Sequence, residues 1–512
     1  MRWKAAFSVA RAIRSKSSLS YVHAASSIPL IGDSIHAQFR ETTARLPDRP
    51  LFVLREQNVR KTYADVYSDV QRLAGGLLHL GLERGDRVAI WSNNHYEWVL
   101  TQLAAAAAGL VLVNLSPAYQ AAELKFALRK GTTGNPKAVV LSHHNIVNNA
   151  NLTGLSLGFN QELATVCIPN PLFHCFACVV GVVSALIHGA TCVFPAASVV
   201  PERTIEAMSA EKCTTIYGTP TMMLDVLNVP TLHEFDLQST HTALVAGSPV
   251  PAALVAELTR RTALKNVVIG YGCTEMTTAV SLSRPTDPLA KRMATVGHVT
   301  PHLELSIQDA DGRIVPRGQA GEICTRGYSR MRGYWDDPKA TTATISSGGW
   351  FHTGDVGCLN EDESLSVVGR LKDMIIRGGE NISPAGDRGP HRPPSPRSGR
   401  SRCSPPAFFL LSSLSQVVGV PDNRMGEEVC AVVQLKAGGS LDEAELKAFC
   451  RERISHYKCP RYVLFKPSAF FPRTPTGKIK KECAGRAGSD GNPRNEREER
   501  RISVLRSVWL AA

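Results

Sequence analysis

The feature that most constrains this chain is an alternation of short apolar segments with helices, repeated along most of its 512 residues. The segment RVAIW at 87–91 is typical of a buried strand, 95–108 of an alanine-rich helix and GLVLVNL at 109–115 of a second strand. A strand, a helix and a strand with short connections form a βαβ unit, which predicts a parallel sheet covered by helices. Similar apolar segments that end in glycine or proline recur at 191–195, 214–220, 241–247 and 266–272.

Two changes of pattern indicate more than one domain. From residue 300 onward strands predominate, which favours a small β subdomain, and after 416 a compact α/β segment begins. In that segment QVVGV and EEVCAVVQL are typical of strands, and Ser440 with Glu443 fits a capping box that opens a helix. Because the chain is too long for one compact core, we expect a large α/β domain followed by a small α+β domain.

The formal net charge of +13 does not indicate a nucleic-acid partner, because the charge is concentrated in two segments. Residues 1–32 contain five basic residues and no acid, and residues 388–402 contain five arginines and no acid. These segments lack the interleaved basic and aromatic residues of a folded nucleic-acid groove. The longest apolar run, 103–113, is far shorter than the ~18 residues of a membrane span, so no transmembrane anchor is expected.

The N-terminal segment is rich in arginine and serine, and it places Trp3, Phe7, Ala10 and Ile13 at helical spacing. This composition is typical of a mitochondrial transit peptide, and an ordinary basic tail is the alternative. We expect residues 1–32 to be a leader that is removed on import into the mitochondrial matrix. Thirteen scattered cysteines, an odd number, agree with a reducing compartment.

A glycine-rich segment, Gly131-Thr-Thr-Gly-Asn-Pro-Lys137, has the composition of a phosphate-binding loop. Its glycines let the backbone wrap around a phosphate, its threonines add hydroxyl donors and its lysine adds a positive charge. The spacing is not that of a Walker loop. On its own such a segment is more often a turn, so its interpretation depends on the other motifs of the chain.

Four further motifs follow in order: YGCTE at 271–275, WFHTGD at 350–355, GRLKDMIIRGGEN at 369–381 and PTGKI at 475–479. With the glycine-rich segment they resemble the motifs of the AMP-forming, or adenylate-forming, ligase superfamily, which includes acyl-CoA synthetases, adenylation domains of peptide synthetases and luciferases. The resemblance is closest to medium-chain fatty acid:CoA ligases. It implies an enzyme that uses ATP and Mg²⁺ to activate a carboxylic acid as an acyl-adenylate and then transfers the acyl group to coenzyme A.

The resemblance also implies a role for each residue that matches a family motif. The β- and γ-phosphates of ATP would be held by the loop residues Gly131, Thr132, Thr133, Gly134 and Lys137. The carboxylate of the substrate is itself the nucleophile, so no Ser–His pair is needed. The enzyme has to align that carboxylate with the α-phosphorus and neutralise the charge of the departing pyrophosphate.

The YGCTE motif and a histidine upstream of it supply the residues implied around the α-phosphate. Tyr271 and Gly272 would border the adenine, and Thr274 would contact the α-phosphate. Glu275 would be the magnesium ligand, a role that suits a hard carboxylate oxygen. His174, in PLFHCF, would lie beside the acyl carboxylate; a packed core role is the alternative for this residue.

The later motifs supply the remaining implied roles. Asp355 would accept both ribose hydroxyls through charge-assisted hydrogen bonds, with Arg370 assisting. Lys372 would be the hinge between the two domains, and Gly379 would flank the pantetheine arm of coenzyme A. Lys478 would reach the α-phosphate and the substrate carboxylate during adenylation.

The chain departs from the family pattern at three places. The glycine-rich loop follows directly on a helix, so the family's preceding strand and leading threonine are missing, an apparent internal deletion at 130/131. Residues 386–411 form a Pro-, Arg- and Ser-rich insert, and 482–512 form a divergent tail. On this comparison the N-terminal AMP-binding domain spans 33–371, and the mobile C-terminal lid spans 372–481.

These departures leave three functions open. The first is a medium-chain fatty acid:CoA ligase, and the second is an adenylating enzyme with another acceptor, such as a carrier-protein thiol. The third is a non-catalytic remnant that binds a nucleotide or a partner. Because misplacing a catalytic group by an ångström can cost ~10²-fold in rate, we expect the chain to turn over at least ~10²-fold more slowly than one with the missing segment restored.

Overall fold

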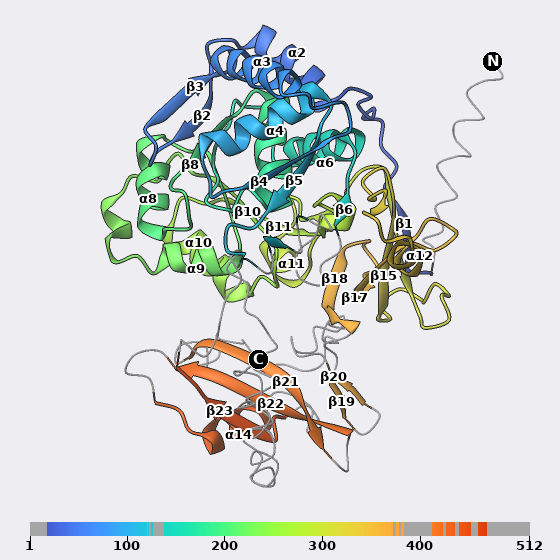
Figure 1. Ribbon diagram of the computed structural model, residues 1–512. Helices are drawn as coiled ribbons and strands as arrows, with labels where there is room; N and C mark the ends of the chain where they lie inside the picture. Colours follow the sequence, from blue (N-terminus) through green and yellow to red (C-terminus); the bar gives the residue numbers. More distant parts are fainter. Residues whose placement is uncertain are drawn as a thin grey trace, which may run out of the picture.

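A nine-stranded sheet organises the N-terminal part of the chain (Figure 1). The computed structural model describes residues 18–119, 121, 124–125, 128, 138–371, 375–377, 380–382, 412–422, 426–435, 440–451 and 459–467. The strands run in the order β13-β12-β11-β10-β9-β7-β8-β2-β3, and those from β11 to β2 are parallel. Their bounds are β2 (Pro50–Leu54), β3 (Val59–Thr62), β7 (Thr165–Cys167), β8 (Thr191–Phe194), β9 (Thr215–Gly218), β10 (Thr242–Val245), β11 (Asn266–Tyr271), β12 (Ser281–Leu282) and β13 (His298–Val299).

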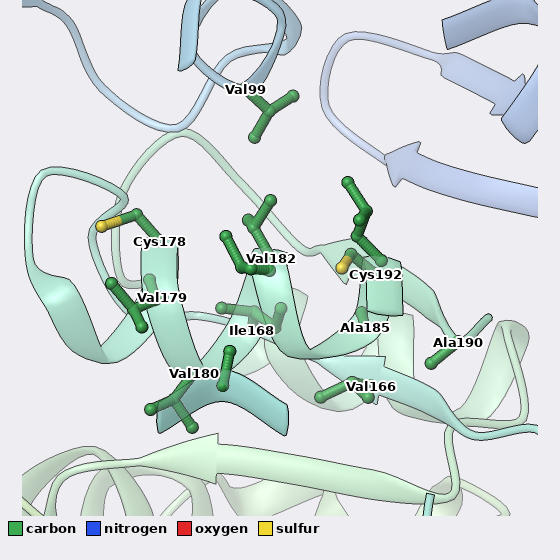
Figure 2. Packing of buried hydrophobic residues seen from close by; sticks show 14 of the residues in the cluster. Val99, Val166, Ile168, Cys178, Val179, Val180, Val182, Ala185, Ala190 and Cys192 are labelled. Carbon is green, nitrogen blue, oxygen red and sulfur yellow. The ribbon is translucent and has the colours of Figure 1, made fainter. Parts of the chain in front are cut away.

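Helices cover both faces of this sheet, because alternate residues of each strand point to opposite sides. Val166 and Cys192 face one apolar cluster, while Cys167 and Val193 face the other. The first cluster packs against α2 (Ile35–Arg45), α3 (Tyr63–His79), α4 (Tyr96–Ala108), α6 (His143–Ser156), the π-helix η1 (Phe176–Val183) and α7 (Ser184–His188). The second packs against α8 (Pro201–Ala210), α9 (Pro220–Leu227) and α10 (Ala252–Arg261). Figure 2 shows part of the first cluster, with Val179, Val180 and Val182 of η1 among its buried side chains.

The strands expected at 191–195, 214–220, 241–247 and 266–272 are confirmed as β8, β9, β10 and β11. The βαβ unit is confirmed as well, with β4 (Arg87–Trp91), α4 and β5 (Val111–Leu115). However, β4 and β5 pair with each other in a parallel sheet of their own, separate from the nine-stranded sheet. Helix α3 begins after Thr62, whose side chain accepts from the Asp65 amide in a capping box.

A five-stranded antiparallel sheet confirms the β subdomain expected from residue 300 onward. Its order is β1-β14-β15-β17-β18, with β1 (Tyr21–His23), β14 (Leu303–Gln308), β15 (Gly321–Gly327), β17 (Phe351–Leu359) and β18 (Leu365–Arg370). A two-stranded ribbon, β6 (Val139–Val140) with β16 (Gly333–Tyr334), lies beside the short helix α12 (Pro338–Thr344). Two further short helices are η2 (Pro230–Glu234) and α11 (Leu289–Ala294).

The C-terminal part has its own sheet, in the order β20-β19-β22-β21 with β23 parallel to β22. Its elements are β19 (Ile375–Arg377), β20 (Glu380–Ile382), β21 (Ser412–Asp422), β22 (Gly426–Leu435), α14 (Glu443–Arg451) and β23 (Tyr462–Phe465). The capping box predicted from Ser440 and Glu443 is wrong by two residues. Asp442 accepts from the Glu445 amide at 2.8 Å, and Glu445 accepts from the Asp442 amide at 3.0 Å, so aspartate is the cap.

Part of the predicted leader packs on the large domain. Strand β1 pairs with β14, and the fully buried Ser20 donates its hydroxyl to the carbonyl of Pro316 at 2.8 Å. Ile31 exchanges two hydrogen bonds, of 2.7 and 2.9 Å, with the side chain of Asn148 on α6. Residues 20–31 therefore belong structurally to the folded domain. Among the described helices, none has both the length and the apolar character needed to cross a membrane.

This packing predicts that a chain beginning at residue 33 is less stable than one beginning at residue 18. The shorter chain loses β1 and both hydrogen bonds between Ile31 and the Asn148 side chain, and each lost hydrogen bond costs ~0.5–1.5 kcal/mol. We expect the midpoint of thermal unfolding, measured by circular dichroism, to fall by several degrees. An unchanged midpoint would show that residues 18–32 do not stabilise the domain.

Candidate active site

The described residues implied in nucleotide binding collect beyond the carboxyl ends of parallel strands. Strand β11 ends at Tyr271, which begins the YGCTE motif, and the segment after β7 carries His174. Ligand sites of open parallel sheets occur at such edges. Some implied residues lie outside the part of the chain that the structure describes, namely Gly131, Thr132, Thr133, Gly134, Lys137, Lys372, Gly379 and Lys478.

Asp355 is the centre of one cluster. It stands opposite Arg370 on paired strands, and its carboxylate accepts from Arg370 Nε at 3.0 Å and from Tyr271 Oη at 2.8 Å. Burial, and then the Asp355 charge, raise the pKa of Tyr271, so its hydroxyl remains a donor. Each carboxylate oxygen has two acceptor sites, so Asp355 retains the capacity to accept ribose hydroxyls. The structure thus brings together three residues that the sequence separates by 84 and 15 positions.

Glu322 on β15, which the sequence analysis missed, holds the backbone of β17 just before Asp355. Its carboxylate accepts from the Gly354 amide and from His352 Nδ1, both at 2.9 Å. Gly354 has a φ of +69°, which glycine adopts readily. Three side chains of the kinds that can bind a metal, Glu322, Cys324 and His352, lie close together. Among the described residues this is the one such group. Because both Glu322 oxygens already accept protein hydrogen bonds, we assign this group the role of holding β17 at residues 352–354.

The segment 271–279 is held in a constrained conformation. A Cβ at Gly272 would lie 1.5 Å from the carbonyl oxygen of Thr278, so no other residue fits there. Thr277 and Thr278 have φ values of 63° and 136°, which cost ~1–3 kcal/mol each for such residues. Asn149 of α6 holds this backbone, donating to the Ala279 carbonyl at 2.8 Å and accepting from its amide at 3.1 Å. Strain of this kind persists only where the surroundings fix it.

Glu275 lies in the short 3₁₀ helix η3 (Thr274–Met276) and is half-buried. Its Oε1 accepts from the hydroxyl of Tyr334 at 3.0 Å. Burial, and then the Glu275 charge, raise the pKa of Tyr334, which keeps this hydroxyl a donor. No other hydrogen bond to the Glu275 carboxylate is found within the described residues. One partly exposed carboxylate fits Mg²⁺, which is commonly bound through one or two carboxylates together with substrate phosphates.

His174 immediately precedes Cys175, which contacts Thr274, the residue implied at the α-phosphate. The Nδ1 of His174 accepts from the Phe176 amide at 3.2 Å. The neighbouring Cys175 places its Sγ 3.6 Å from Thr274 Oγ1. His174 is half-buried, whereas every residue of the π-helix η1 that follows it is buried. Single-turn π segments inside helices are frequent at functional sites.

Cys175 has an unusual ionisation for a buried thiol. Burial alone would raise its pKa, but the charge of His174 and hydrogen bonds with His174, Thr278 and Thr274 outweigh burial and lower the pKa to about 7. Cys178, one turn on, has no such partner charge, and burial raises its pKa. The structure therefore distinguishes two neighbouring thiols that the sequence presents as a pair.

We expect Cys175 to be alkylated by iodoacetamide with a rate that rises with pH around a midpoint near 7. The reason is that only the thiolate reacts and its fraction rises as pH passes the pKa of about 7. Peptide mapping by mass spectrometry measures each cysteine separately, and Cys178 is the internal control that stays unlabelled over the same range. A midpoint near 9.0, the ordinary thiol value, would contradict the expected ionisation.

Comparisons with known proteins agree with this arrangement. The profile described as AMP-binding enzyme matches residues 39–130 and 131–335, and that of the AMP-binding enzyme C-terminal domain matches 415–478. The protein named "Medium-chain acyl-CoA ligase ACSF2, mitochondrial" from Danio rerio is 37% identical over 559 residues, with 90% of this chain and 89% of that protein covered.

Two solved structures show the same fold. The anthranilate CoA ligase AuaEII in complex with anthranoyl-AMP matches with a TM-score of 0.79 at 21% identity, covering 90% of this chain and 98% of that one. ATP-bound MatB from Rhodopseudomonas palustris matches with a TM-score of 0.76 at 22% identity, covering 89% and 99%. The expected large α/β domain followed by a small domain is thereby confirmed.

Proposed function

The chain belongs to the AMP-binding enzyme family, and we propose that it activates a medium-chain fatty acid with ATP and transfers the acyl group to coenzyme A. The observation that carries this proposal is the 37% identity, over 90% of the chain, to a medium-chain acyl-CoA ligase. The cluster of Asp355, Arg370 and Tyr271 supports it, because it offers acceptors and an aromatic ring for a nucleoside.

In the first half-reaction a carboxylate oxygen of the acid attacks the α-phosphorus of ATP, and the bond from this phosphorus to pyrophosphate breaks. Asp355 would hold the ribose, Tyr271 and Gly272 would border the adenine, and Thr274 would orient the α-phosphate near His174. Glu275 would hold Mg²⁺, which supplies charge neutralisation on the phosphates. Alignment of the two reacting atoms is the main catalytic requirement.

Residues outside the described part would complete this step. Gly131, Thr132, Thr133, Gly134 and Lys137 would hold the β- and γ-phosphates. Lys478 would add a positive charge at the α-phosphate and the substrate carboxylate.

The second half-reaction forms the thioester. The thiol sulfur of coenzyme A, after losing its proton, attacks the acyl carbon, and AMP leaves with the electrons of the broken C–O bond. The C-terminal domain would turn about Lys372, which withdraws Lys478 and brings Gly379 beside the pantetheine arm. Such a domain rotation lets one cleft serve two reactions in sequence.

We place this reaction in mitochondria, specifically in the matrix. The similar protein from Danio rerio is named as mitochondrial, and the N-terminus has the composition of a transit peptide. The packing of β1 favours a leader shorter than the 32 residues expected from composition, because cleavage near residue 32 would remove that strand.

Incubation of the protein with octanoate, ATP, Mg²⁺ and coenzyme A tests the proposed function. We expect octanoyl-CoA, AMP and pyrophosphate in equal amounts, measured by liquid chromatography and mass spectrometry. Asp355→Asn is the matched control, because it removes the charged acceptor of the ribose and should abolish most product. Formation of ADP instead of AMP would exclude an adenylate intermediate.

The two other functions give different results in the same assay. An adenylating enzyme with another acceptor would exchange pyrophosphate into ATP in the presence of octanoate but would form no thioester with coenzyme A. A non-catalytic remnant would do neither.

A further prediction concerns the apparent deletion at 130/131. Two findings support such a deletion: the family profile matches in two parts that meet at this point, and the alignment with the Danio rerio protein spans 559 residues, more than the 512 of this chain. We expect this chain to exchange pyrophosphate at least ~10²-fold more slowly than a chain with the relative's segment inserted there, because a phosphate loop without its preceding strand is poorly positioned. Equal rates would show that the loop needs no such strand.

A further inference from the structure

Glu275 is held twice by one short segment, residues 331–335. The amide of Met331 donates to the backbone carbonyl of Glu275 at 2.7 Å. The hydroxyl of Tyr334 donates to the Glu275 carboxylate at 3.0 Å. Backbone and side chain of Glu275 are thus both tied to a segment 56 or more positions away in the sequence.

The same segment holds the residues that follow the glycine-rich loop. The amide of Trp335 donates to the carbonyl of Ala138 at 2.8 Å, and the amide of Arg332 donates to that of Val140 at 2.9 Å. Ala138 follows Lys137 directly in the sequence, so β16 anchors the chain where it leaves the loop. Segment 331–335 therefore connects the exit of the loop with Glu275.

The segment is itself fixed by helix α12. The amide of Tyr334 donates to Thr341 Oγ1 at 2.9 Å, and Tyr334 is only 8% exposed. Gly333 has a φ of +154°, and a Cβ there would lie 3.0 Å from the Thr341 side chain, so the close contact requires glycine. The Tyr334 hydroxyl consequently has a defined position from which to donate.

We propose that Tyr334 is a positioning residue for Glu275. Its hydroxyl engages Oε1, which restrains the rotation of the carboxylate and leaves Oε2 to the Mg²⁺ that accompanies ATP. This inference rests on the proposed role of Glu275 as the magnesium ligand. Partners that orient a metal ligand through a hydrogen bond typically change metal affinity or activity by ~10–100-fold when removed.

Packing is the competing explanation, because Tyr334 also belongs to an apolar cluster with Met276, Met331 and Phe351. Tyr334→Phe separates the two roles, since phenylalanine keeps the ring and removes only the hydroxyl. Tyr96→Phe is the matched control: Tyr96 is also 8% exposed and donates to a carboxylate, that of Asp69, at 2.7 Å. Its partner lies on α3, and neither residue is implied in the site.

The test measures ATP binding by the full chain as a function of Mg²⁺ concentration, by isothermal titration calorimetry without fatty acid. We expect Tyr334→Phe to raise the half-saturating Mg²⁺ concentration by ~10-fold or more, and to leave ATP binding without Mg²⁺ unchanged. Tyr96→Phe should match the unaltered chain. Glu275→Gln should show the larger shift, and adding Tyr334→Phe to it should have little further effect, because the hydroxyl then lacks its charged partner.

The outcomes separate this inference from the function on which it rests. If Glu275→Gln shifts the Mg²⁺ dependence and Tyr334→Phe does not, the positioning role of Tyr334 is overturned while the proposed function stands. If Glu275→Gln leaves the dependence unchanged, the magnesium assignment falls, and this inference falls with it. A loss of ATP binding by Tyr334→Phe that is equal with and without Mg²⁺ would show a packing role only.

Discussion

The backbone of residues 271–279 is the constraint on which the rest of the site depends. Gly272 lies against the Thr278 carbonyl so closely that the chain can follow only one path there, and Asn149 of α6 holds the far end. From this path three side chains reach three different parts of the molecule. Tyr271 meets Asp355 of the β subdomain, Thr274 meets Cys175, and Glu275 meets Tyr334. Their relative positions are thus set by one rigid segment rather than by separate loops.

The sequence predicts the parts of this structure that leave a local pattern. Buried parallel strands read as short apolar runs, so β8 to β11 could be found, and motif order singles out Asp355 and Glu275 as candidates. Glu322 and Tyr334 could not be found this way, because their roles arise from contacts with Gly354 and Glu275, 32 and 59 positions away. No periodicity or spacing in one sequence records such pairs.

One local prediction placed a helix boundary wrongly, and in a second segment the structure shows a contact that composition does not reveal. Ser440 and Asp442 are both suitable caps, and only the competition between them decides where α14 starts. The composition of residues 1–32 is that of a leader throughout, yet three of these residues, the strand β1 at 21–23, pair with β14.

The surroundings of the glycine-rich loop differ at its two ends. Its exit is anchored, because β6 pairs with β16 and β16 is fixed by Thr341. Upstream, β4 is the one partner of β5 among the described strands. This small parallel sheet leaves Trp91 51% and Val111 39% exposed, whereas parallel strands are normally covered on both faces. The cluster of Asp355, Arg370 and Tyr271, for which we propose nucleoside binding, depends on neither strand. If the proposed roles hold, an interruption at 130/131 should weaken contacts with the β- and γ-phosphates far more than recognition of the adenosine, because only the proposed phosphate contacts depend on the loop entrance.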